Sequence, residues 1–116
     1  MSVARALLSR KLDRAKKERD AEAKDVAYYD RRVADGRIKL DRLRIDQGMI
    51  GGDDLRGAIE AADWWLRKNE ASLAIHKRMA ASAESRVSCL EAKLLRIGGY
   101  VCVPEPRYRL ATSQDG

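Results

Sequence analysis

The stretch Gln47-Gly48-Met49-Ile50-Gly51-Gly52-Asp53-Asp54 separates two long, highly charged segments whose apolar residues have helical spacing. Its glycines can adopt backbone angles that are closed to other residues. Either aspartate can cap a following helix, because a side-chain oxygen at a helix start accepts hydrogen bonds from backbone N–H groups. We therefore predict a hairpin, in which a helix over about 3–47 and a helix over about 54–97 are joined by a turn at 48–53.

Apolar residues recur every seven positions on both sides of this break, in two rows per segment. The rows of the first segment are Leu12, Arg19, Val26, Val33, Leu40, Gln47 and Leu8, Ala15, Glu22, Tyr29, Gly36, Leu43. The rows of the second segment are Ile59, Leu66, Leu73, Ala80, Val87, Leu94 and Leu55, Ala62, Asn69, His76, Ala83, Leu90, Ile97. A sustained seven-residue repeat of this kind predicts a coiled coil.

Folding the chain about the glycine break places residue i close to residue 102 − i. Apolar residues of the two segments then meet one another, and Gly36 falls beside Trp65. Gly36 therefore marks either a bend or a space left for the indole. Arg19 and Glu22 fall opposite alanines, past which their long stems can extend outward to solvent. This match favours an antiparallel hairpin within one chain over a parallel dimer.

The composition agrees with long helices. Of 116 residues, 36% are charged and 5% aromatic, and Phe is absent. Such a mixture is typical of coiled coils and leaves room for one domain. The predicted fold class is all-α, a long antiparallel two-helix coiled-coil hairpin at 1–97. Glycines at 98–99 end the second helix, and two prolines favour a short extended arm at 98–116 with a disordered end.

The formal net charge is +6, and the excess lies near the N-terminus. The basic residues there are Arg10, Lys11, Arg14, Lys16, Lys17 and Arg19. Such a patch attracts nucleic acid, anionic lipid or an acidic protein face, or is simply a solvated helix face. Two cysteines are too few for a disulfide framework, and no apolar run has the length of a signal peptide or membrane span. We therefore predict a cytoplasmic protein without membrane contact.

No catalytic, cofactor or metal motif stands out. His76 is the only histidine, and it occupies a row position together with Asn69, where a polar residue usually sets register or partner choice. No further metal ligand or nucleophile lies at helical spacing from it. The glycines at 48–52 lack the Lys-Ser/Thr of a phosphate-binding loop. We predict no enzyme activity, no cofactor and no bound metal.

Several large apolar residues lie outside the rows that form the seam. They are Trp64, Trp65, Ile75 and Met79 in the second segment, and Ile38 and Ile45 in the first. A two-helix hairpin cannot bury them all, so they indicate a second interface. Three occupants remain open: a partner protein, the C-terminal arm folded back, or a second copy forming a four-helix bundle.

The N-terminal sequence Ala-Leu-Leu-Ser-Arg-Lys-Leu-Asp-Arg-Ala-Lys-Lys-Glu-Arg-Asp resembles the opening of the export-stalk proteins of flagellar and type III secretion systems. The polar turn followed by a Trp-bearing second helix is also similar to that family. The resemblance covers about residues 4–97 and rests on architecture and composition. It implies a basic antiparallel coiled-coil hairpin that contacts an export ATPase ring and its gate.

These observations lead to two functional hypotheses. The first is a non-enzymatic coiled-coil protein that docks onto a larger protein assembly as an adaptor, stalk or inhibitor. The alternative is a small basic protein associated with nucleic acid, such as an accessory or host-takeover protein of a phage or other mobile element. Phosphate contacts make binding strongly dependent on salt, whereas apolar docking is nearly independent of it, so salt separates the two hypotheses.

Overall fold

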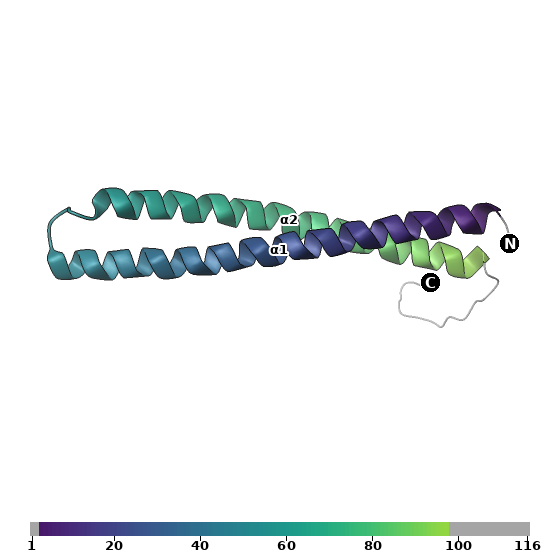
Figure 1. Cartoon of the computed structure of the whole chain (residues 1–116), viewed down its shortest axis with the longest axis horizontal. Coiled ribbons are helices and arrows are strands. Elements are labelled where there is room, and N and C mark those ends of the chain that lie inside the picture. The colour runs from purple at the N-terminus through teal and green to yellow at the C-terminus, as the bar shows by residue number, and fades with distance from the viewer. Residues whose placement is uncertain (1–2, 98–116) are drawn as a thin grey trace, which may run out of the picture. The chain divides into compact units, whose positions relative to one another are not determined.

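The computed structural model describes residues 3–97, which form two helices joined by a turn. Helix α1 (Val3–Ile50) and helix α2 (Arg56–Ile97) run antiparallel as a hairpin (Figure 1). The predicted all-α hairpin is therefore confirmed, while the predicted arm at 98–116 lies outside the described residues. Neither helix contains a stretch that is both long and apolar enough to cross a membrane.

The hairpin divides into two compact units. One consists of residues 18–83 and contains the turn, and the other combines the N-terminal part of α1 with the C-terminal part of α2. In the second unit Ala15 and Val87 are buried. All the candidate sites described below, apart from most of the basic patch, lie in the 18–83 unit.

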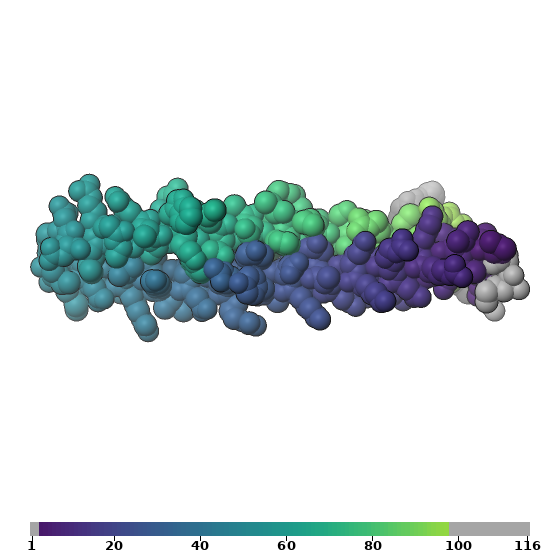
Figure 2. Space-filling view, turned by 45° about the horizontal axis from the view of Figure 1, so that its top comes forward, coloured from purple at the N-terminus to yellow at the C-terminus, as the bar shows by residue number. Residues whose placement is uncertain are grey.

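The core of the 18–83 unit is a strip of apolar side chains between the helices. Its buried members are Val33, Leu40, Ala62, Leu66 and Leu73, with Val26, Tyr29, Leu43 and Ile59 packed against them. Figure 2 shows the two helices lying against each other here, with several long side chains of α1 projecting away from α2. Every predicted row position is buried or half-buried except Ile97, so the seven-residue repeat is confirmed.

The predicted register is also confirmed within this unit. Arg32 bonds to Asn69, and a Cβ at Gly36 would touch Trp65 and Leu66. The residue numbers of each pair add up to 102 or one less, as folding about the glycine break requires. α1 continues as one helix through Gly36, so this glycine makes room for the indole.

The turn is shorter and later than the sequence predicts. α1 ends at Ile50 instead of about 47, and α2 begins at Arg56 instead of about 54. The change of direction occurs at Gly51 and Gly52, whose φ angles of 79° and 66° are left-handed. The Gly51 N–H donates to the Gln47 carbonyl at 2.9 Å, which is how a left-handed glycine commonly ends a helix.

The side chain of Gln47 holds the turn together. Its Nε2 donates to the carbonyls of Gly51 and Gly52 at 2.9 and 2.8 Å, and its Oε1 accepts from the Leu55 N–H at 2.6 Å. The prediction that Asp53 or Asp54 caps the second helix through its side chain is therefore wrong. Gln47 takes this role because its row position faces Leu55 across the seam.

Candidate functional site

The seven-residue repeat gives each helix two flanks and an outer face. We letter the rows a (Val33 in α1, Leu66 in α2) and d (Gly36 in α1, Asn69 in α2). Positions c and g then lie on one side of the seam, b and e lie on the other, and f points directly away from the partner helix. These letters place every candidate residue relative to the seam.

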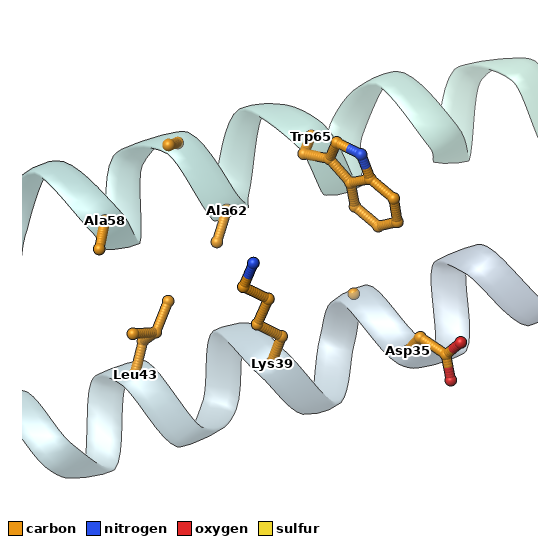
Figure 3. Close-up of a pocket in the computed structure, with 8 residues that line it drawn as sticks. Asp35, Lys39, Leu43, Ala58, Ala62 and Trp65 are labelled. Carbon is orange, nitrogen blue, oxygen red and sulfur yellow. The ribbon is translucent and has the colours of Figure 1, made fainter.

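A groove of about 550 Å³ runs between the helices on the c/g side. It is lined by Asp35, Gly36, Lys39, Leu43, Ala58, Ala61, Ala62 and Trp65. Figure 3 shows the Trp65 ring directed from α2 towards α1, Leu43 directed towards Ala58, and the Lys39 chain rising towards α2. We call this feature the docking groove. Its walls are mostly apolar, and it is open to solvent on one side.

The groove exists because small residues face larger ones. Three alanines of α2 lie opposite Lys39 and Leu43 and leave the space between the helices unfilled. Trp65 closes one end by packing onto Gly36, where an added Cβ would lie 2.7 Å from its Cζ3 atom. Since real Cβ atoms do not approach so closely, a side chain at position 36 would displace the indole.

The two flanks of α2 differ sharply in polarity. The c/g flank of α2, our name for this series, carries Ala58, Ala61, Trp65, Lys68, Ser72, Ile75 and Met79. The b/e flank over the same length carries Arg56, Glu60, Asp63, Arg67, Glu70, Ala74 and Lys77. In a hairpin without further partners both flanks of α2 would face water, so no difference in their polarity would be expected. The c/g flank is therefore the side suited to further packing.

Three of the predicted docking residues lie on the c/g flank of α2. Ile75 and Met79 are exposed there. Trp65 is half-buried, because one part of its ring packs on Gly36 and the Cζ atom of Arg32 lies 4.7 Å from the ring centroid. Trp64 occupies the neighbouring f position, where it is 60% exposed with the Lys68 ammonium 4.8 Å above its ring.

Ile38 and Ile45 do not join this surface. Both occupy f positions of α1 and are 55% and 61% exposed. The f positions of the two helices point in opposite directions, so a single flat partner cannot contact Trp64 and these isoleucines together. The structure therefore separates the six predicted docking residues into two sets, one per helix.

The predicted basic patch is spread around α1. Arg10, Arg14 and Lys17 share one exposed side, because residues four and seven positions apart lie above one another. Lys11 is exposed on a different side and Lys16 is half-buried. Arg19 is engaged with Asp20 at 3.1 Å. Only three of the six residues thus form a continuous cationic stripe.

A second polar site, which we call the histidine cluster, was not predicted. The Nδ1 atom of His76 lies 3.0 Å from Glu22 Oε1 and 3.8 Å from Asp25 Oδ2. The ring of Tyr29 stacks on the imidazole, with centroids 5.0 Å apart and planes 15° apart. Glu22 is directed at the histidine and its side chain is only 17% exposed, so the prediction that it extends outward is wrong.

The expectation that His76 lacks ligand-type neighbours is also wrong. Spacing along α2 does not reveal these neighbours, because both carboxylates come from α1. The signal was nevertheless present in the register, which sets His76 opposite Val26. Glu22 precedes Val26 by four positions and lies on the same helix face, and Asp25 occupies the adjoining g position on the c/g side of the seam.

Asn69 forms the other polar interruption of the seam. It is buried, its Oδ1 accepts from Arg32 Nε at 2.9 Å, and its Nδ2 donates to the Trp65 carbonyl at 2.8 Å. Arg32 Nη1 also donates to the Tyr28 hydroxyl at 2.9 Å. The amide is thus satisfied on both sides, which ties Arg32 and Trp65 to one another.

Fold and site together define a two-helix hairpin with one apolar flank. Comparisons with protein families, with curated proteins and with solved structures found no match to this chain. The resemblance to export-stalk proteins therefore stays a prediction.

Proposed function

We propose that this chain is a non-enzymatic helical hairpin that docks onto a larger protein assembly as an adaptor, stalk or inhibitor. The observation that carries the proposal is the docking groove, which is continuous with the c/g flank of α2. Apolar positions on that flank extend from Ala58 to Met79, with Lys68 as the charged exception. A groove between two helices is where a third helix packs in a helical bundle.

The occupant we propose is an amphipathic helix of another protein. Its apolar side would cover the three groove alanines and Trp65. Its edge towards α1 would carry charges, because the c and g positions of α1 beside the groove are Asp35, Lys39, Arg42 and Asp46. Apolar contact on one side and paired charges on the other would fix how the partner helix sits.

A second copy of this chain fits the groove less well. Two hairpins packed face to face would bury the charged c/g positions of both α1 helices. Taking such charges out of water costs several kcal/mol per ion, and pairing between the copies recovers that cost only where the geometry is excellent. A single helix placed towards α2 leaves those charges at the solvent edge, where they remain hydrated.

Position-specific crosslinking tests this proposal. A photoreactive amino acid replaces Ala61 in the groove or, as the matched control, Ala74, an exposed alanine on the b/e flank of the same helix. In the cells that naturally produce the chain, we expect an adduct with a different protein from position 61 and none from position 74. Equal adducts from both positions, or adducts between copies of this chain only, would contradict the proposal.

A tryptophan variant tests the same surface by binding. Trp64→Ala combined with Trp65→Ala should abolish capture of the partner identified by crosslinking, because Trp65 is lost from the groove and Trp64 from the neighbouring f position. The helical circular dichroism signal should survive. Ile38→Ala with Ile45→Ala serves as the matched control, since these residues face away from α2. Full binding by the tryptophan variant would show that the surface lies elsewhere.

A second candidate function is association with nucleic acid, and the stripe of Arg10, Arg14 and Lys17 supports it. Among residues 3–97, none of these three cations is engaged by a carboxylate. Three phosphate contacts would give a salt slope of about −2 to −3 in logarithmic units. A gel shift with random DNA and RNA at two salt concentrations tests this candidate, and the absence of a complex at both concentrations eliminates it.

A further inference from the structure

We propose that the histidine cluster is a binding site for a divalent transition-metal ion, with Zn²⁺ as the best match. Its ligands are His76 Nδ1 and one carboxylate oxygen each from Glu22 and Asp25. These three atoms all lie within 4.8 Å of one another. The site is independent of the docking groove and of the function proposed for it.

The spacing of the ligand atoms suits a small ion. Zinc binds nitrogen and oxygen ligands at about 2.0–2.1 Å in a tetrahedron, which places neighbouring ligand atoms about 3.3 Å apart. The two distances from Nδ1, 3.0 and 3.8 Å, lie on either side of that value. Small rotations of the two carboxylates would equalise them. Three protein ligands leave a fourth position for water, as in open zinc sites.

The charge of the cluster also favours a cation. Among residues 3–97, neither Glu22 nor Asp25 pairs with a lysine or arginine, and both carboxylates share one imidazole. The Glu22 side chain is mostly buried, so its negative charge is poorly hydrated. A divalent ion would neutralise both carboxylates at once.

The histidine is held in place before any ion binds. Stacking on Tyr29 fixes the plane of the imidazole, so that Nδ1 faces the two carboxylates. Mg²⁺ and Ca²⁺ prefer ligand sets made entirely of oxygen, whereas imidazole nitrogen suits zinc and its transition-metal neighbours. The mixed set of one nitrogen and two oxygens therefore selects the class of metal.

The ligands come from both helices, so the ion would bridge α1 and α2. Binding to the folded hairpin alone raises its stability by mass action. At a zinc concentration 100 times the dissociation constant, we expect the melting temperature to rise by about 10 °C. Mg²⁺ at the same concentration should leave it unchanged.

The test uses the full chain with Cys89→Ser and Cys102→Ser and without a histidine tag, because thiols and tags bind zinc by themselves. Isothermal titration with Zn²⁺ should give one ion per chain, accompanied by the thermal shift. Glu22→Gln and His76→Gln should each weaken binding at least tenfold. Asp30→Asn, which neutralises an exposed α1 carboxylate outside the cluster, should bind zinc as the parent does.

A second measurement does not depend on variants that fold. The chain contains a single histidine, so its imidazole ¹⁵N resonances need no assignment to a residue, and their couplings to the ring protons distinguish Nδ1 from Nε2. Zinc should shift the Nδ1 resonance strongly and the Nε2 resonance weakly. An unchanged imidazole spectrum at saturating zinc, or a thermal shift that persists in both Glu22→Gln and His76→Gln, would overturn the proposal.

Discussion

Gly36 determines where the Trp65 ring lies, and with it the shape of the docking groove. The missing side chain lets Trp65 lie against α1, and the indole in turn closes one end of the docking groove. A glycine inside a helix costs about 1 kcal/mol relative to alanine. Glycine at position 36 therefore lowers the stability of α1 and in return allows the Trp65 ring to pack against this helix.

Gly36→Ala should destabilise the hairpin by about 1–2 kcal/mol, although helix propensity alone predicts a gain of about 1 kcal/mol. The reason is the 2.7 Å approach of the new Cβ to Trp65 Cζ3. Urea unfolding measures the change. In a Trp64→Phe background the fluorescence of the remaining Trp65 should also shift to the red as the indole is displaced.

The matched control for that variant is Gly57→Ala, because an added Cβ at position 57 meets no atom within 4 Å. It should stabilise the protein through helix propensity alone. Adding Trp65→Ala to Gly36→Ala should relieve the clash, so the two changes are expected to be strongly non-additive. A stabilised Gly36→Ala single variant would contradict the close packing of glycine and indole.

The sequence predicts some residue contacts and not others. The pairing of Gly36 with Trp65 follows from the register, because it sets the two residues next to each other at the seam and the absence of a side chain at Gly36 leaves space for the indole. The position of Glu22 does not follow, since a glutamate beside an alanine can extend to water or turn along the helix to His76. The choice depends on a hydrogen bond between the helices, which spacing within one helix does not reveal.

At the scale of elements, the turn shows why helix ends are harder to predict than helices. The glycines mark the break, but Gly48 continues α1 and the left-handed backbone begins only at Gly51. The end is set by the hydrogen bonds of Gln47, a side chain that the repeat assigns to the seam. The seven-residue pattern predicts the helices themselves reliably, because the same requirement to bury the row positions recurs in every heptad of both helices.

Gln47→Ala should destabilise the hairpin by about 1–2 kcal/mol, measured by urea unfolding. The change removes the bonds to the Gly51 and Gly52 carbonyls and to the Leu55 N–H. Gln47→Glu separates these bonds, because a carboxylate still accepts from Leu55 but cannot donate to the carbonyls. We expect it to be at least as destabilised as Gln47→Ala, because its carboxylate would face the Gly51 and Gly52 carbonyl oxygens at the negative end of α1. Equal stabilities of all three proteins would show that the turn is held by glycine alone.

At the scale of the whole molecule, burial is concentrated in the 18–83 unit. Its apolar cluster, its turn and the bonds of Arg32, Asn69 and His76 all connect α1 to α2. The unit formed by the chain ends places smaller side chains in its core, namely Ala15 and Val87. The two units are therefore expected to open with different free energies.

Native-state hydrogen exchange tests this expectation residue by residue. Amides of Val33–Leu40 and Ala62–Leu73 should exchange slowest, because they flank the buried cluster. Amides of 3–14 should exchange faster, since their side chains are exposed or only half-buried. Uniform protection along both helices would instead indicate that the hairpin opens in a single cooperative step.

The hydrogen bonds made by Gln47 also bear on the order in which the chain folds. Gln47 and Leu55 are only 8 positions apart, whereas Arg32 and Asn69 are 37 apart and Glu22 and His76 are 54 apart. Closing a short loop costs the least chain entropy, and each closed pair shortens the loop that remains for the next. Folding should therefore start at the turn, and pairing of the two helices should then extend stepwise along the seam away from it. During synthesis, the register would be set as soon as the first turns of α2 leave the ribosome.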